Sequence, residues 1–294
     1  MSRDILDVSD RRYSYSADGV RKTCEAQYCY KYTLGIEKDA DAEEDAAAFR
    51  FGKAFHQVCE HTNHEARLFN MDILSRAAFE NHVNTEDATK VFACLQSYYQ
   101  LHAASKLQCI GIELEIGNEE YVGYIDAVMA DANGNWWIVD LKTSGMVVES
   151  LFARLHMDPQ LNLYAAFASQ IAEKLKIPLE KFVGCRYRVV TKPRTVPKTG
   201  ESHATYAARA NVETYDIEVS RSDMDPQAAL YEILEGREKA KAISVHTFRR
   251  NRANCLSWNR PCNYWSNCHG KTFTECVASA KVFTTKSMND RTKQ

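Results

Sequence analysis

The feature that most constrains the fold is a change in hydrophobic periodicity near Leu107. Three consecutive runs, at 107–116, 121–130 and 136–143, are rich in β-branched and aromatic residues, which favour strands. Residues Asp131 to Gly134, between the last two runs, form a turn signal. The sequence therefore predicts a three-stranded antiparallel meander in this part of the chain.

Segments with other periodicities surround the meander. Residues 46–68 and 84–104 have helical spacing, and Asp158 with Pro159 marks the start of another helix. Further strands are predicted at 182–190 and 214–219, a long loop at 191–210 and a helix at 225–242. This order predicts a mixed α/β (α+β) domain.

Composition narrows the class of protein. The chain has 294 residues, 45% of them hydrophobic, with 37 Lys and Arg against 39 Asp and Glu, which excludes a disordered or collagen-like chain. It has no apolar run near the roughly 20 residues that span a bilayer, and no signal sequence is recognised. We therefore expect a cytoplasmic protein without a membrane partner, in which the ten cysteines are thiols or metal ligands rather than disulfides.

Acidic and basic side chains fall together on the meander. Asp140 and Lys142 lie two apart on a predicted strand and so share one face, and Asp126 lies on the preceding strand. Two carboxylates this close favour a divalent cation between them, and Mg²⁺ and Mn²⁺ prefer oxygen ligands. Such a metal would acidify a bound water and polarise a phosphate, while Lys142 would position that water or stabilise negative charge.

Three further residues extend this pattern. His56, on the first predicted helix, offers a neutral imidazole as a metal ligand, and Gln160 and Tyr164 share one face of the helix after Pro159. An Asp and a Lys two apart are, on their own, most often a solvent-facing pair. Tyr164 fits equally well as a core residue of an amphipathic helix.

Four short motifs occur in a fixed order along the chain: G-x-x-x-H at 52–56, G-Y-I-D at 123–126, D-L-K at 140–142 and Q-x-x-x-Y at 160–164. Together they resemble the RecB-like branch of the PD-(D/E)XK nuclease superfamily, over roughly residues 13–268. The resemblance implies a restriction-endonuclease-like core, with a central mixed sheet flanked by helices.

The resemblance also implies roles for individual residues. His56, Asp126, Asp140 and the backbone carbonyl of Leu141 would bind Mg²⁺ or Mn²⁺, and Lys142 would be catalytic. Gln160 and Tyr164 would hold DNA or brace the site. Glu113 matches a further acidic position of the branch, with Glu115, on the same strand face, as the competitor for that role.

Cysteines cluster near the C-terminus, at Cys255, Cys262 and Cys268, close enough in sequence to ligate one metal centre. Members of the branch with an iron-sulfur cluster take a fourth ligand from an N-terminal C-x3-[FY]-x-Y motif, and that resemblance points to Cys24. Cys29 and Cys276 remain possible substitutes. Spacing alone does not separate a 4Fe-4S cluster from zinc, and the resemblance favours iron.

Joining Cys24 to Cys255 closes a loop of about 230 residues, so the cluster is expected to fasten both ends of the chain to the core. The predicted organisation is a single nuclease domain at 1–276, in which 1–35 and 243–276 meet at the cluster. The C-terminal Cys-rich segment thus carries the iron-sulfur site, and a mobile tail follows at 277–294.

The activity that this resemblance implies is that of a metal-dependent DNA exonuclease on single-stranded DNA or DNA ends. It would be of phage type, related to CRISPR-associated RecB-like exonucleases, in a bacterial or phage-infected cell. The segment 186–210 is basic, with Arg186, Arg188, Lys192, Arg194, Lys198 and Arg209 against Glu201. From Lys192 to Arg209 it resembles the basic insert of phage members, which would track the phosphate backbone.

Two other readings stay open. One is a non-catalytic DNA-binding or assembly factor on the same fold, acting with a recombination, replication or CRISPR partner protein. The other is a zinc-stapled structural protein. The complete set of His56, Asp126, Asp140 and Lys142 favours the enzyme.

Overall fold

The computed structural model describes residues 12–36, 47–145, 158–244, 246–256 and 262–270, together with 150, 152 and 155. They fall into two compact units, Asp45–Glu232 and the two chain ends, Met1–Glu44 with Ile233–Gln294. The predicted tail at 277–294 and the alternative ligand Cys276 lie outside the described residues.

The larger unit contains a five-stranded sheet in the order β1-β2-β3-β4-β5. Its strands are β1 (Gln108–Gly117), β2 (Val122–Ala130), β3 (Trp136–Ser144), β4 (Phe182–Thr191) and β5 (Thr214–Ser220). β3 and β4 are parallel, and the other neighbours are antiparallel. The sequence-based prediction of an antiparallel meander within a mixed sheet is confirmed.

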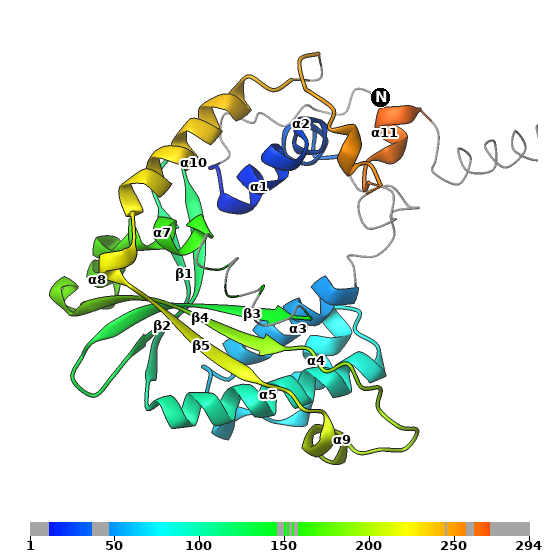
Figure 1. Ribbon diagram of the computed structural model, residues 1–294, viewed down its shortest axis with the longest axis vertical. Helices are drawn as coiled ribbons and strands as arrows, with labels where there is room; N and C mark the ends of the chain where they lie inside the picture. Colours follow the sequence, from blue (N-terminus) through cyan, green and yellow to red (C-terminus); the bar gives the residue numbers. More distant parts are fainter. Residues whose placement is uncertain are drawn as a thin grey trace, which may run out of the picture. The chain divides into compact units, whose positions relative to one another are not determined.

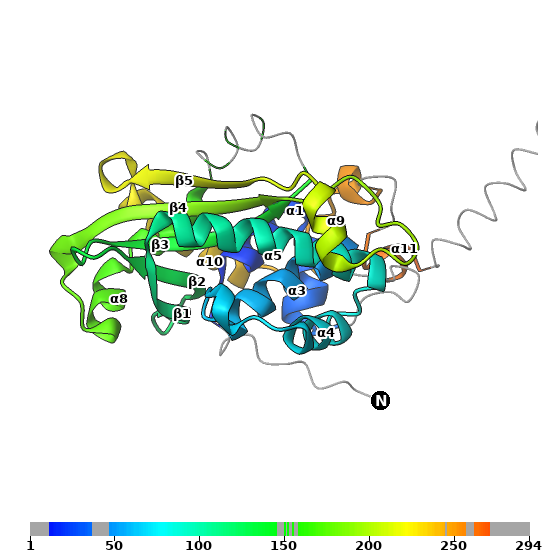
Figure 2. The same cartoon turned by 90° about the horizontal axis from the view of Figure 1, so that it is seen from below.

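Helices cover both faces of this sheet (Figures 1 and 2). One face packs on α3 (Ala47–His61), α4 (Met71–Glu80) and α5 (Thr85–Ser105), and the other on α7 (Pro159–Ala165) and α8 (Ala168–Leu175). Alternation along β3 explains the two cores: Val139 packs in the first, and Ile138 in the second. The arrangement is that of a restriction-endonuclease-like fold.

Local capping chemistry explains where two helices begin. Asp158 accepts a hydrogen bond from the Gln160 amide at 2.9 Å, and Pro159 occupies the first turn of α7, as predicted. The prediction of a loop throughout 191–210 is wrong, because α9 (His203–Arg209) lies within it. Ser202 caps that helix, and Tyr206 anchors it in the core.

The basic character of 186–210 is also partly neutralised by β5, which the sequence analysis did not foresee. Arg186 forms ion pairs with Asp216 and Glu218. Arg188 is fully buried, with its guanidinium 2.7 Å from His102 Nδ1 and 3.4 Å from Asp216. Burial and the neighbouring Arg188 lower the pKa of His102 to about 4, so this imidazole accepts the hydrogen bond in its neutral form. Both arginines therefore form ion pairs between β4 and β5.

The smaller unit brings together segments from opposite ends of the sequence. It contains α1 (Tyr15–Thr23), α2 (Glu25–Tyr28) and α11 (Trp265–His269), while α10 (Pro226–Lys241) runs into it from the larger unit. The Ala26 amide donates to the Arg249 carbonyl at 3.2 Å, and Asn251 Nδ2 donates to the Thr23 carbonyl at 3.0 Å. Its aromatic core joins Tyr30, which follows α2, to Tyr264.

No helix in the described part of the chain has the length and apolar character needed to cross a membrane.

Candidate active site and cysteine cavity

Asp126 lies where β2 and β3 separate. Their pairing ends at Ala127 and Val139, and beyond that point the amide of Leu141 donates instead to Asp126 Oδ2 at 2.7 Å. The other carboxylate oxygen lies 3.4 Å from Nδ1 of His56, which α3 presents. One carboxylate is thus held by a strand amide and an imidazole from two different elements.

Asp140 and Lys142 lie on β3 with the predicted common orientation. Asp140 is 3% exposed, and its Oδ2 is 2.7 Å from Lys142 Nζ. The ammonium also donates to Gln160 Oε1 at 3.1 Å, and Gln160 Nε2 donates to the Tyr164 hydroxyl at 2.7 Å. The structure therefore connects Asp140, Lys142, Gln160 and Tyr164 through direct contacts between β3 and α7.

The pKa values of the titratable groups in this site depend on two opposing effects, burial and the charge of neighbouring side chains. Burial raises the pKa of Asp140 to about 6, against the opposing effect of Lys142. Burial would also raise the pKa of Asp126, but His56 and the Leu141 amide outweigh it and lower that pKa. In turn, the charge of Asp126 overcomes burial and raises the pKa of His56.

Glu113 lies next to this group on β1. The pairs Ile112–Ala127 and Leu114–Ile125 flank it, which places Glu113 opposite Asp126. Burial and the charges of Asp126 and Glu60 raise its pKa to about 7.

The competing residue Glu115 instead accepts a hydrogen bond from the Tyr124 hydroxyl at 3.2 Å. Sequence reasoning missed Glu60, although it lies four residues after His56 on α3 and so shares its helix face.

Glu113 has a φ of 45°, a left-handed conformation that is unusual inside a strand. Replacing Glu113 with Gly should raise the free energy of unfolding by about 1 kcal/mol, since Gly adopts this φ without steric cost. Glu113→Gln, which keeps the strain and removes the charge, should lack that part of the gain. Thermal unfolding of both variants checks this. Destabilisation by Gly would contradict it.

The donor set fits a divalent metal ion chemically. Across the described ranges, no three His, Cys, Asp or Glu side chains are already arranged as ligands around one point. Asp140 Oδ2 is nevertheless buried and accepts no aligned hydrogen bond from the described residues, apart from its ion pair with Lys142. Its lone pairs, with those of Asp126 and the His56 imidazole, are donors that Mg²⁺ or Mn²⁺ accepts.

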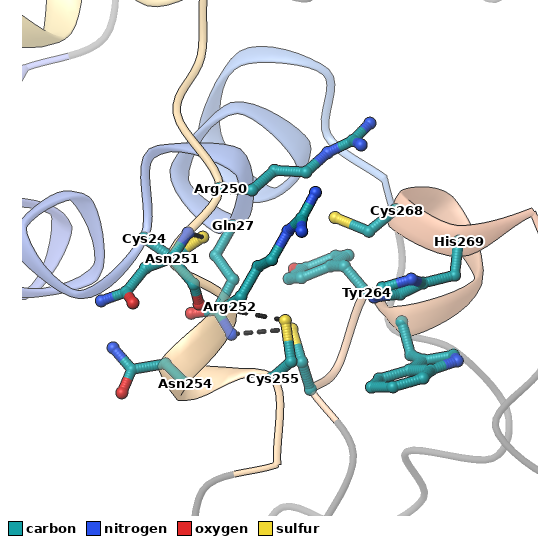
Figure 3. A pocket seen from close by; sticks show the side chains of 12 residues that line it. Cys24, Gln27, Arg250, Asn251, Arg252, Asn254, Cys255, Tyr264, Cys268 and His269 are labelled. Carbon is teal, nitrogen blue, oxygen red and sulfur yellow. Dashed lines mark hydrogen bonds between the residues drawn. The ribbon is translucent and has the colours of Figure 1, made fainter.

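A second site lies within the smaller unit, as a cavity of about 350 Å³ (Figure 3). All four predicted cysteines, Cys24, Cys255, Cys262 and Cys268, line this cavity. Cys29 is buried but is not among the lining residues. The geometry therefore favours Cys24 over Cys29 as the N-terminal member of the group.

Donors that sequence reasoning missed surround these thiols. The Gln27 side-chain amide donates to Cys262 Sγ at 2.9 Å, and the Asn251 backbone amide donates to Cys24 Sγ at 3.4 Å. Arg250 and Arg252 also line the cavity, as Figure 3 shows. Burial raises the pKa of the Cys255 and Cys268 thiols, and the charge of Arg250 opposes that shift in both.

The predicted DNA-binding residues of the basic segment differ in their surroundings. Lys192 Nζ lies 4.6 Å from the centroid of the Phe51 ring, and burial lowers the pKa of this lysine. Arg209 pairs with Glu201 at 2.5 Å and donates to the Val196 carbonyl at 3.0 Å, so it braces its own segment. Arg194 and Lys198 are exposed.

Comparison with known protein families defines the class. Residues 12–269 match the model of the PD-(D/E)XK nuclease superfamily, and the chain belongs to that superfamily. Its members are generally nucleases that use divalent metals such as Mg²⁺ or Mn²⁺, and DNA is the substrate that membership implies. Among curated proteins, no sequence is significantly similar to this chain.

Proposed function

We propose that this protein is a divalent-metal-dependent deoxyribonuclease of the RecB-like branch, acting as an exonuclease on single-stranded DNA or DNA ends. The observation that carries the proposal is two sets of contacts near the end of β3. His56 and the Leu141 amide both contact the Asp126 carboxylate. Lys142 pairs with Asp140 and donates a hydrogen bond to Gln160. Burying two carboxylates, an ammonium and an imidazole in one place costs desolvation free energy, and such groups of perturbed titratable side chains are concentrated at functional sites.

The roles of the residues follow from these contacts. His56, Asp126, Asp140 and the Leu141 carbonyl would hold a divalent metal ion, which when bound would polarise the phosphodiester and acidify water. Lys142, held between Asp140 and Gln160, would stabilise negative charge that develops on the phosphate. Gln160 and Tyr164 would fix the ammonium in this position, and Glu113 would supply a further carboxylate beside Asp126.

We also propose a 4Fe-4S cluster in the cysteine cavity, as in the phage-type and CRISPR-associated relatives that the motifs resemble. Four cysteines line the cavity, and a 4Fe-4S cluster takes four cysteine ligands. The cavity of about 350 Å³ has room for a multi-atom cluster. Arg250 and Arg252 would offset its negative charge.

The proposed activity is tested with end-labelled single-stranded and linear duplex DNA and with circular DNA of both kinds, in Mg²⁺, Mn²⁺ or EDTA. We expect products released progressively from the ends of linear substrates, no cleavage in EDTA and intact circles. Glu180→Ala, an exposed carboxylate change in the turn before β4, is the matched control and should behave as wild type.

If circular DNA is cleaved at a rate similar to linear DNA, the protein is an endonuclease and the proposed exonuclease activity is wrong. DNA binding without cleavage in any metal would favour the alternative, a non-catalytic DNA-binding or assembly factor in recombination or CRISPR adaptation. Binding of neither DNA form would overturn both.

A further inference from the structure

An exposed aromatic ring lies beside the proposed active site. Tyr124 is 52% exposed and is located on β2, two residues before Asp126. Side chains two apart on a strand point to the same side of the sheet, with Cα atoms about 7 Å apart. The Tyr124 ring therefore lies on the same face of the sheet as the Asp126 side chain, two residues earlier on β2.

The hydroxyl end of this ring is anchored, whereas the ring itself has no stacking partner in the described parts of the chain. Tyr124 pairs with Glu115 across β1 and β2, and its hydroxyl donates to Glu115 Oε2 at 3.2 Å. No aromatic or cation-π contact within the described ranges involves this ring, although many other tyrosines have one. An oriented ring with an exposed face is suited to stacking on a planar ligand.

We propose that Tyr124 is a stacking platform for a base of the DNA strand whose phosphate enters the site at Asp126 and Asp140. This inference rests on the proposed nuclease function and deepens it by assigning a residue that selects the form of the substrate. An unpaired base can leave its neighbours and stack on a side chain, whereas a base in duplex must first be unstacked and unpaired. Tyr124 thus selects single-stranded DNA or a frayed end.

The experiment measures DNA binding in an Asp140→Asn background, so that cleavage does not interfere. Tyr124→Ala should weaken binding of a single-stranded oligonucleotide about five- to 150-fold, the range that loss of one stacked base gives, with little change for a blunt duplex. Tyr124→Phe should bind as the parent does, because it keeps the aromatic face and loses only the hydroxyl. Fluorescence anisotropy with labelled oligonucleotides gives the affinities.

A spectroscopic signal separates stacking from a structural role. A 2-aminopurine next to the bound phosphate should be quenched by the parent and by Tyr124→Phe, and should stay bright with Tyr124→Ala. Tyr231→Ala is the matched control, since Tyr231 lies on α10 and is 71% exposed. It should change neither affinity nor quenching.

Three results would overturn the inference: equal affinity of Tyr124→Ala and its parent for single strands, equal losses on single strands and duplex, or a Phe variant as weak as Ala. If wild-type protein cleaves DNA and any of these is found, only the role of Tyr124 fails. If wild-type protein neither binds nor cleaves DNA, the proposed function fails first.

Discussion

Asp140→Ala and Lys142→Ala should each lower the rate of DNA cleavage by about a thousandfold or more. Removing one preorganised electrostatic group from an active site typically costs 10²–10³-fold, and a group that also binds the metal costs more. The two variants should differ in mechanism. Asp140→Ala loses a proposed metal ligand, whereas Lys142→Ala keeps the ligands and loses the cation beside the phosphate.

Two measurements separate these effects. Titration calorimetry with Mn²⁺ should show weakened binding for Asp140→Ala and near wild-type binding for Lys142→Ala, while single-turnover cleavage falls in both. Circular dichroism should show that both fold, and Lys181→Ala, an exposed lysine change before β4, should cleave normally. Wild-type cleavage by either variant would remove that residue from the catalytic group.

If the proposed cluster is present, Cys24→Ser should destabilise the smaller unit and release that cluster. Protein purified anaerobically should be brown and contain about four irons per chain, because sulfur-to-iron charge transfer absorbs visible light. Binding free energy of a structural metal is also folding free energy, so the variant should lose about 5 kcal/mol or more of stability. In a chain of this size that corresponds to a fall of about 10 °C or more in Tm.

Cys29→Ser is the matched control, because Cys29 is buried on the same N-terminal segment but does not line the cavity. It should keep its iron even if the substitution costs some stability. Full iron in Cys24→Ser together with loss in Cys29→Ser would identify Cys29 as the ligand. Colourless anaerobic protein with one zinc per chain would replace the cluster with a zinc staple.

The parts of the site that were predictable from sequence depend on local geometry. Strand alternation is enough to place Asp140 and Lys142 on one face, and helix spacing is enough to place Gln160 above Tyr164. The contact between Asp126 and the Leu141 amide was not predictable, because it requires β2 and β3 to separate at Ala127. Glu60 carried a weak signal, its spacing from His56, but nothing in the sequence identified Glu113 as its neighbour.

The main errors in predicting the fold have a similar cause. Arg188 reads as one more cation of a basic segment until the sheet order places Asp216 beside it and His102 above it. The helix α9 follows a Pro- and Gly-containing stretch that is typical of loops, and its stability comes from the Ser202 cap and buried Tyr206. Tertiary packing, which propensity does not contain, decided the burial of both Arg188 and Tyr206.

The smaller unit combines segments from early and late in the sequence, so its parts are synthesised at different times during translation. Cys24 leaves the ribosome about 230 residues before Cys255, which corresponds to roughly 10 to 50 s at ordinary elongation rates. During that interval α1 and α2 lack the partners that Arg249 and Asn251 later provide. The residues around the cavity can therefore assemble only after the segment that carries Arg249 and Cys255 has been synthesised.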